Sequence, residues 1–182
     1  MKLLKVLVAH CFFTLGLAAP LLAAAEEASQ VPFGDKVGTE ITNYNRLRPL
    51  IATGGSIDLA RIDTIAKLGF KTIVDLRTPE EGVAQEKAAV EAAGMRYLNL
   101  PVDKGVPSEQ VIAGLSAVLA DNSAAPVLVH CGSGNRVGTA WAIYRAQSGV
   151  PLEIAIEEGR AAGMRDSRER QVRALLAEPV AE

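Results

Sequence analysis

The sequence has few of the side chains that cross-link small domains or bind metal ions. Its 182 residues include only two cysteines and two histidines, and aromatic residues make up 4% of the total. His10 and Cys11 belong to an apolar N-terminal stretch, so the rest of the chain has one histidine, His130, and one cysteine, Cys131. That number excludes an internal disulfide framework and a metal site built from histidine and cysteine. We therefore expect neither a metal ion nor a cofactor.

An excess of positive charge is also missing. The chain has 19 basic and 21 acidic residues, and without its first 25 residues the balance is 17 to 21, a net charge of −4. A chain with this balance is not expected to bind nucleic acid. Beyond residue 25 the apolar runs are too short to cross a membrane, and about 157 residues are enough for one domain with a substantial core.

The N-terminus has the pattern of a secretory signal. Lys2 and Lys5 precede an apolar stretch at 6–22, which is followed by three alanines. An uncleaved anchor is the alternative, because a membrane span takes about 20 apolar residues, but Pro20 and the small residues favour cleavage after Ala25.

This reading sets the expected domain boundaries. We expect a signal peptide at 1–25, a flexible leader at 26–40, which mixes charge with glycine and proline, and a single domain at 41–182. The mature protein is expected in the periplasm or secreted, without stable insertion in the membrane.

Beyond residue 41, short apolar runs alternate with segments of helical periodicity. Runs at 71–76, 96–100 and 127–129 are typical of buried strands. The segment 42–53 predicts a strand at a sheet edge, because Pro49 lacks the N–H that an inner strand donates. The alternation predicts an α/β fold, with a central, mostly parallel sheet flanked by helices and ligands bound at the carboxyl ends of the strands.

Several helix starts carry caps. Ser56 and Ser108 are expected to cap the helices that follow them, and Thr78 with Glu81 forms a capping box. Two amphipathic helices are expected near the C-terminus, at 152–161 and 167–177. The arginines of this region are scattered among acidic residues, which indicates a solvated helical face rather than a phosphate-binding patch; they are Arg160, Arg165, Arg168, Arg170 and Arg173.

Residues 126–138 join an apolar run to a glycine-rich turn and an arginine. Helical spacing resumes at Ala140, so Cys131 is predicted to lie between a strand and a helix N-terminus. Unpaired N–H groups and the positive end of the helix dipole stabilise an anion there and favour a thiolate. Arg136 adds a guanidinium fork for the oxygens of an anion. Cys131 is therefore a candidate nucleophile.

This loop resembles the signature of the cysteine-dependent phosphatases, His-Cys-x-x-Gly-x-x-Arg, with His130, Cys131, Gly134 and Arg136 in the matching positions. It has four residues between cysteine and arginine instead of five, and Val137 stands where a Ser or Thr hydroxyl is usual. The shorter loop is also typical of the rhodanese-like sulfurtransferases, which hold a persulfide. The loop alone thus leaves open a phosphatase, a sulfurtransferase with a Cys131 persulfide, and a non-catalytic oxyanion-binding protein.

A wider set of segments resembles one family. These segments are, in order, Gly54-Gly55, residues 69–77, Gly94-Met95-Arg96-Tyr97 and Leu100-Pro101-Val102. They look like the bacterial beta-lactamase-hydrolase-like phosphatase family, which is related to the dual-specificity-type tyrosine phosphatases, and some members carry the shortened loop. The resemblance covers about residues 41–165.

The resemblance implies a cysteine-phosphatase-like fold and a hydrolase of phosphomonoesters, such as phosphotyrosine or phosphoserine in proteins. Cys131 would form a phosphocysteine intermediate, and the phosphate would be bound by the loop residues Gly132, Ser133, Gly134, Asn135 and Arg136. The expected partner is a phosphorylated substrate, whose identity the sequence does not indicate.

Phosphatase chemistry also requires an acid for the leaving alkoxide and a base for water. Asp103 is the candidate, because it follows the strand at 96–100 in a loop; a solvent-facing loop acid is the alternative. Asp75 and Arg77, at the end of another strand, are the second candidates, but a structural ion pair that ties strand to helix is the favoured interpretation of these two residues. His130 is expected to support the loop rather than touch substrate, because neighbouring residues on a strand point to opposite faces.

Overall fold

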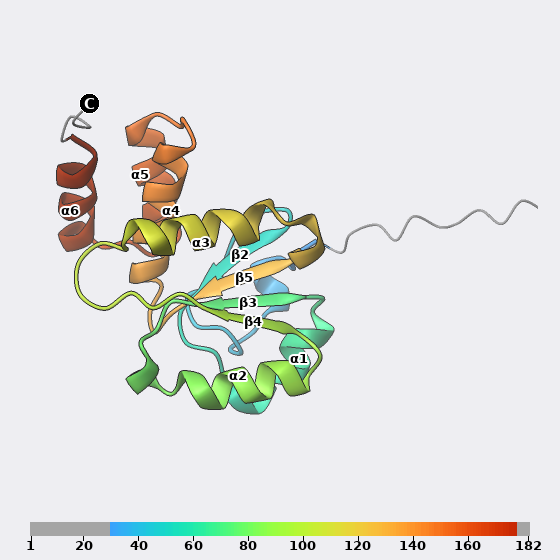
Figure 1. The fold of residues 1–182 in the computed structure, drawn as a ribbon. Helices are drawn as coiled ribbons and strands as arrows, with labels where there is room; N and C mark the ends of the chain where they lie inside the picture. The colour runs from blue at the N-terminus through green and yellow to red at the C-terminus, as the bar shows by residue number, and fades with distance from the viewer. Residues whose placement is uncertain (1–29, 178–182) are drawn as a thin grey trace, which may run out of the picture.

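A five-stranded sheet lies at the centre of the computed structural model, which describes residues 30–177 (Figure 1). The strands lie in the order β1-β2-β5-β3-β4; β1 runs antiparallel to β2, and all other neighbours are parallel. Their bounds are β1 Asn45–Arg48, β2 Ile51–Gly54, β3 Thr72–Asp75, β4 Arg96–Asn99 and β5 Val127–His130. The predicted α/β fold with a mostly parallel central sheet is confirmed.

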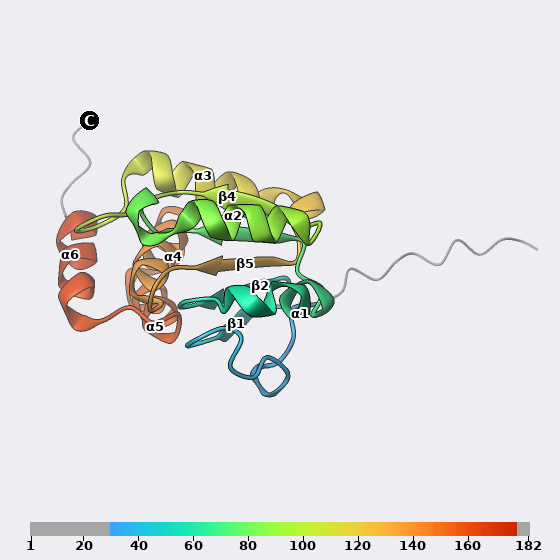
Figure 2. The same ribbon diagram turned by 90° about the horizontal axis from the view of Figure 1, so that it is seen from below.

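Helices cover both faces of this sheet. The α-helices are α1 (Ile62–Lys67), α2 (Val83–Ala92), α3 (Glu109–Ala120), α4 (Asn135–Gln147), α5 (Leu152–Ala161) and α6 (Asp166–Ala177). Short 3-10 helices are formed by Gly34–Lys36, Leu59–Arg61, Pro79–Glu81 and Asn122–Ala124. Helices α1 and α2 lie on one side of the sheet and α3 and α4 on the other, while α6 lies beyond the end where the parallel strands finish (Figures 1 and 2). Within residues 30–177, none of the helices combines the length and apolar character of a membrane span.

The sheet separates two buried clusters. Ile73 and Leu128 belong to the cluster on the face of α1 and α2, whereas Val74, Val129 and Cys131 belong to the cluster that includes residues of α3 and α4. Alternate residues of a strand point to opposite faces. This alternation sends His130 and Cys131 to opposite sides of the sheet, as the sequence predicted.

The expected single edge strand at 42–53 is wrong. The segment forms a hairpin, in which β1 and β2 pair antiparallel and Pro49 lies in the turn between them. Only β1 is at the sheet edge, because β2 also pairs with β5. Proline is excluded from an inner strand because it lacks an N–H. Pro49 respects this restriction because it lies in the turn that follows β1.

Two further expectations need correction. The part of the predicted flexible leader that the structure describes is packed, since Val31 and Val37 are 2% and 1% exposed and belong to the core. Ser56 does not cap a helix; Asp58 does, by accepting a hydrogen bond from the N–H of Ala60. The caps at Thr78 and Ser108 are confirmed. The predicted signal peptide lies outside the described residues.

Candidate active site

The parallel strands end in one row. Gly54, His130, Asp75 and Asn99 are register partners at the carboxyl ends of β2, β5, β3 and β4. The loops that follow therefore start side by side at one edge of the sheet, where α/β folds bind ligands. Cys131 directly follows β5, so the structure places it at this edge.

The Cys131 loop, residues 131–136, turns sharply into α4. Cys131 is 1% exposed, and the backbone N–H of Gly134 donates to its Sγ at 3.2 Å. Gly134 has φ of 89°, a left-handed conformation that glycine adopts at little cost, and α4 begins at the next residue. The sulfur thus accepts a hydrogen bond from an amide at a helix N-terminus, the end of a helix where backbone N–H groups favour a bound anion.

Two carbonyl groups of this loop accept hydrogen bonds from residues outside the loop. The N–H of Ser56 donates to the carbonyl of Gly132, and Asn43 Nδ2 donates to the carbonyl of Ser133, both at 3.2 Å. In a trans peptide the N–H points opposite to the carbonyl of the preceding residue. The N–H groups of Ser133 and Gly134 therefore point inward, toward the position that an anion would occupy.

Arg136 lies in the first turn of α4 and is anchored by Glu81. Its Nη1 and Nη2 donate to the two oxygens of Glu81 at 2.6 and 2.7 Å, and Nη1 also donates to the carbonyl of Val102 at 3.1 Å. The hydrogen bond from Arg136 lowers the pKa of Glu81 to about 2. The hydrogen bond to Glu81, and then the charge of Cys131, raise the pKa of Arg136. The Nε–H and one Nη2–H donate to no oxygen atom among residues 30–177, and the guanidinium also lies close to the Cys131 side chain.

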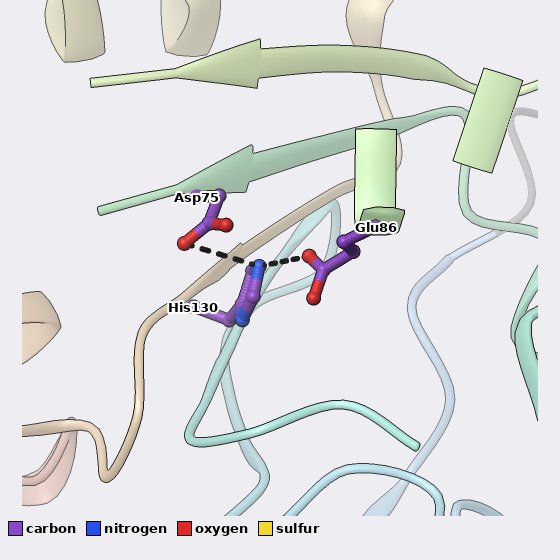
Figure 3. Close-up of side chains that lie close together, drawn as sticks. All are labelled: Asp75, Glu86 and His130. Carbon is purple, nitrogen blue, oxygen red and sulfur yellow. Dashed lines mark ion pairs between the residues drawn. The ribbon is translucent and has the colours of Figure 1, made fainter. Parts of the chain in front are cut away.

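His130 belongs to a buried group of charged side chains on the other face of the sheet (Figure 3). Asp75, Glu86 and His130 are 0% exposed. Arg77 donates to Asp75 Oδ2 at 2.8 Å and to Glu86 Oε2 at 2.6 Å, and the Tyr97 hydroxyl donates to Asp75 at 2.7 Å. The expected ion pair of Asp75 and Arg77 is present, and Glu86 extends it from β3 to α2.

Both ring nitrogens of His130 face oxygen atoms. Nε2 lies 2.6 Å from Glu86 Oε1 and 3.6 Å from Asp75 Oδ1, and Nδ1 lies 3.2 Å from the carbonyl of Gly55. The contact between Nε2 and Glu86 Oε1 does not meet hydrogen-bond geometry, so neither of these two buried atoms has a hydrogen-bond partner among the described residues. Although burial alone raises the pKa of Asp75, hydrogen bonds from Arg77 and the charge of His130 hold it below its ordinary value.

Asp75, Glu86 and His130 also have the atom types of a metal site, with ligand atoms that all lie within 4.8 Å of one another. Arg77 already supplies positive charge to both carboxylates, because its Nη2 donates to Asp75 and to Glu86. We therefore interpret the group as an ion network. The expected absence of a metal stays a prediction.

The loop after β4 carries Asp103, which is exposed. Its carboxylate has no hydrogen-bond partner in the described part of the chain, but its backbone carbonyl accepts from Arg168 Nη2 at 3.2 Å. Arg168 Nη1 donates to the carbonyl of Gly105. The interpretation of Arg168 as part of a solvated face is thus wrong, because this side chain reaches a loop 65 residues away. By contrast, Arg160 and Arg173 pair with acidic residues.

The chain matches known proteins over most of its length. Residues 43–150 match the family described as Beta-lactamase hydrolase-like protein, phosphatase-like domain. The Beta-lactamase hydrolase-like protein of Agrobacterium fabrum is 30% identical over 118 residues, which are 62% of this chain and 27% of that protein. Dual specificity protein phosphatase TpbA of Pseudomonas aeruginosa is 27% identical over 166 residues, 90% of this chain and 74% of that protein.

A solved structure shares the fold. The crystal structure of TpbA from Pseudomonas aeruginosa in complex with pTyr matches with a TM-score of 0.59 and 23% identity, over 82% of this chain and 89% of that chain. The predicted phosphatase class and cysteine-phosphatase-like fold are confirmed. With more than half of its residues inside the matched region, the chain belongs to the phosphatase-like domain family of the beta-lactamase hydrolase-like proteins.

Proposed function

We propose that this protein is an exported, cysteine-dependent phosphatase that hydrolyses phosphomonoesters through a phosphocysteine intermediate. The observation that carries the proposal is the Cys131 loop, in which Sγ accepts a hydrogen bond from Gly134 at the N-terminus of α4 and Arg136 follows in the first turn. Membership of a phosphatase-like family supports the same chemistry. The roles of Cys131, Arg136 and Asp103 belong to this proposal.

Arg136 has donors left for a phosphoryl group. A guanidinium has five N–H groups, and three of those on Arg136 are used by Glu81 and Val102. The remaining Nε–H and Nη2–H lie along one edge and form a fork that suits two phosphoryl oxygens. Glu81 therefore orients Arg136 without occupying the edge that the substrate requires.

Two displacements complete the proposed reaction. The Cys131 thiolate attacks phosphorus, the bond from phosphorus to the leaving oxygen breaks, and Asp103 gives its proton to that oxygen. Water then attacks the phosphocysteine and gives a proton to Asp103, the bond between sulfur and phosphorus breaks, and phosphate leaves. The inward N–H groups of Ser133 and Gly134, together with Arg136, stabilise the charge on the phosphoryl oxygens in both steps.

The short loop and the name of one relative refine the proposal. With four residues between Cys131 and Arg136, fewer amides surround the phosphoryl group, so turnover is expected to be slower than in phosphatases with five. The relative TpbA is named a dual specificity protein phosphatase, which supports phosphotyrosine and phosphoserine in proteins as the substrates.

An aryl phosphate assay in the presence of a chelator tests the reaction. We expect activity in the wild type and background activity in Cys131→Ser, and mass spectrometry after acid quenching should find a phosphate on Cys131. Sulfur transfer from thiosulfate to cyanide is measured on the same preparation. Equal hydrolysis by wild type and Cys131→Ser, or sulfur transfer that exceeds hydrolysis, would refute the proposed function.

Export is tested separately. Lys2, Lys5 and the apolar stretch at 6–22 support cleavage after Ala25. Mass spectrometry of the protein recovered from a bacterial periplasm should find Glu26 at the N-terminus. Recovery of the intact chain in the cytoplasm would contradict export and leave the catalytic proposal unaffected.

A further inference from the structure

The start of α6 and the residues before it contact both loops of the candidate site. Asn135 Oδ1, from the Cys131 loop, accepts a hydrogen bond from the N–H of Arg165 at 2.9 Å. The same region packs against Gly134, where an added methyl carbon would lie only 3.1 Å from the carbonyl oxygen of Ala162. Three residues after Arg165, Arg168 reaches the loop that carries Asp103. Residues 162–168 thus join two loops that are far apart in the sequence.

Two arginines hold the backbone of the Asp103 loop, which we define as residues 101–107. Arg136 donates to the carbonyl of Val102, and Arg168 donates to the carbonyls of Asp103 and Gly105. The Asp103 carboxylate itself is left without a hydrogen bond among the described residues. A fixed backbone with an unoccupied carboxylate is the arrangement that a general acid needs, because its proton must be transferred to the substrate and not to the protein.

Arg168 also has an unusual charge environment for a surface helix. It is half-buried, and within residues 30–177 it forms no ion pair with a carboxylate. Burial, and then the charge of Arg136, lower the pKa of Arg168, whereas the charge of Cys131 raises it. A guanidinium kept out of water beside another guanidinium is costly unless its hydrogen bonds are used. The hydrogen bonds of Arg168 go to the Asp103 loop, whereas those of a solvated arginine would go to water.

We propose that Arg168 is a positioning residue that holds the Asp103 loop against the Cys131 loop through the carbonyls of Asp103 and Gly105, so that Asp103 can serve as the general acid. This inference rests on the proposed phosphatase function. Because Arg168 acts through Asp103, its loss should matter only where the leaving group needs a proton. An ester of an acidic phenol, such as 2,4-dinitrophenyl phosphate, leaves without that help, whereas phenyl phosphate does not.

The test compares kcat/KM for these two substrates, because kcat/KM includes no step after the leaving group departs and is therefore insensitive to the second role of Asp103 as the base for water. Asp103→Asn should lower kcat/KM for phenyl phosphate about 100-fold, as the loss of a general acid does, and Arg168→Met should lower it about 10-fold. On 2,4-dinitrophenyl phosphate, kcat/KM of both variants should stay within about 2-fold of wild type, which also shows that they are folded. In the Asp103→Asn background, Arg168→Met should have no further effect on kcat/KM for phenyl phosphate, since the two residues act as a unit. The decline of kcat/KM at alkaline pH that reports the acid should weaken in both variants.

Two controls keep the result interpretable. Arg170→Met removes an exposed arginine from the same helix and should leave both substrates unchanged. Arg168→Lys keeps the charge but not the guanidinium fork, and it replaces Arg168→Met if that variant fails to fold. Equal losses on both substrates, no loss on either, or an additional loss in the Asp103→Asn background would each overturn the inference. If Asp103→Asn affects both substrates equally while Cys131→Ser is inactive, the inference fails and the phosphatase proposal stands.

Discussion

Glu86 offers a sharp test of the ion network beneath the Cys131 loop. Glu86→Gln keeps the shape of the side chain but removes one of two negative charges that face Arg77 and His130. Asp75 on β3, Glu86 on α2 and His130 on β5 are all 0% exposed, so water cannot compensate for the lost charge. The substitution should therefore destabilise the folded protein well beyond the cost of a surface substitution.

The magnitude follows from the burial. Removing one partner of a buried ion pair costs about 3–5 kcal/mol, and the glutamine oxygen can still accept one hydrogen bond from Arg77, so we expect about 3 kcal/mol. For a domain of this size each kcal/mol lowers Tm by about 2–4 °C, which gives a decrease of about 6–12 °C. With a urea m-value of about 2 kcal/mol/M, the midpoint should fall by about 1.5 M.

The assay is urea unfolding at pH 7, followed by circular dichroism. The matched control is Glu91→Gln in the same helix, since the Glu91 side chain is 48% exposed and, within residues 30–177, pairs with Lys87 alone. Such a surface pair is worth less than about 0.5 kcal/mol. A loss below about 1 kcal/mol for Glu86→Gln, or losses of equal size in the two variants, would refute the reasoning that a desolvated network holds this region.

Two further predictions concern close packing and the arginine anchor. In Gly138→Ala the new carbon would lie 2.3 Å from the Gly159 carbonyl oxygen, so α4 and α5 must separate, and the urea midpoint should report a loss of about 1–3 kcal/mol or more; an unchanged midpoint contradicts this packing. Glu81→Gln should lower kcat/KM about 10-fold by loosening Arg136. Because the pKa of Glu81 falls from 4.5 to about 2 on folding, its stabilising effect is complete above pH 4.5 and is lost as the pH falls toward 2. The urea midpoints of wild type and Glu81→Gln should therefore converge in acid, and a constant difference would show that this ion pair does not contribute.

Local signals explain what the sequence predicted well. The apolar run before Cys131 and the glycine-rich turn after it define a strand and a helix start, and both lie where they were expected. The capping box of Thr78 and Glu81 is a pattern within four residues, and it is present. The sequence did not show that Glu81 also binds Arg136, because that contact joins residues 55 apart.

Long-range contacts explain what the sequence missed. Glu86 was indistinguishable from a solvent-facing residue of a helix, yet it is fully buried because Arg77 and His130 reach it from two strand ends. Arg168 was assigned to a solvated face because its sequence neighbours are charged, and its partners lie more than 60 residues earlier. The hairpin of β1 and β2 was missed because Pro49 indicates both an edge strand and a turn.

The contact between Asn135 and Arg165 has a consequence for how this family is delimited. The match to the family model ends at residue 150, before α5 and α6 begin. Yet Asn135, inside the matched region, accepts a hydrogen bond from the backbone N–H of Arg165, which lies 15 residues after the end of that region and just before α6. Residues outside the matched region thus form one wall of the Cys131 loop. Relatives that share the signature but differ in this C-terminal segment can therefore differ in loop geometry, and so in turnover, without any change in the residues by which the family is recognised.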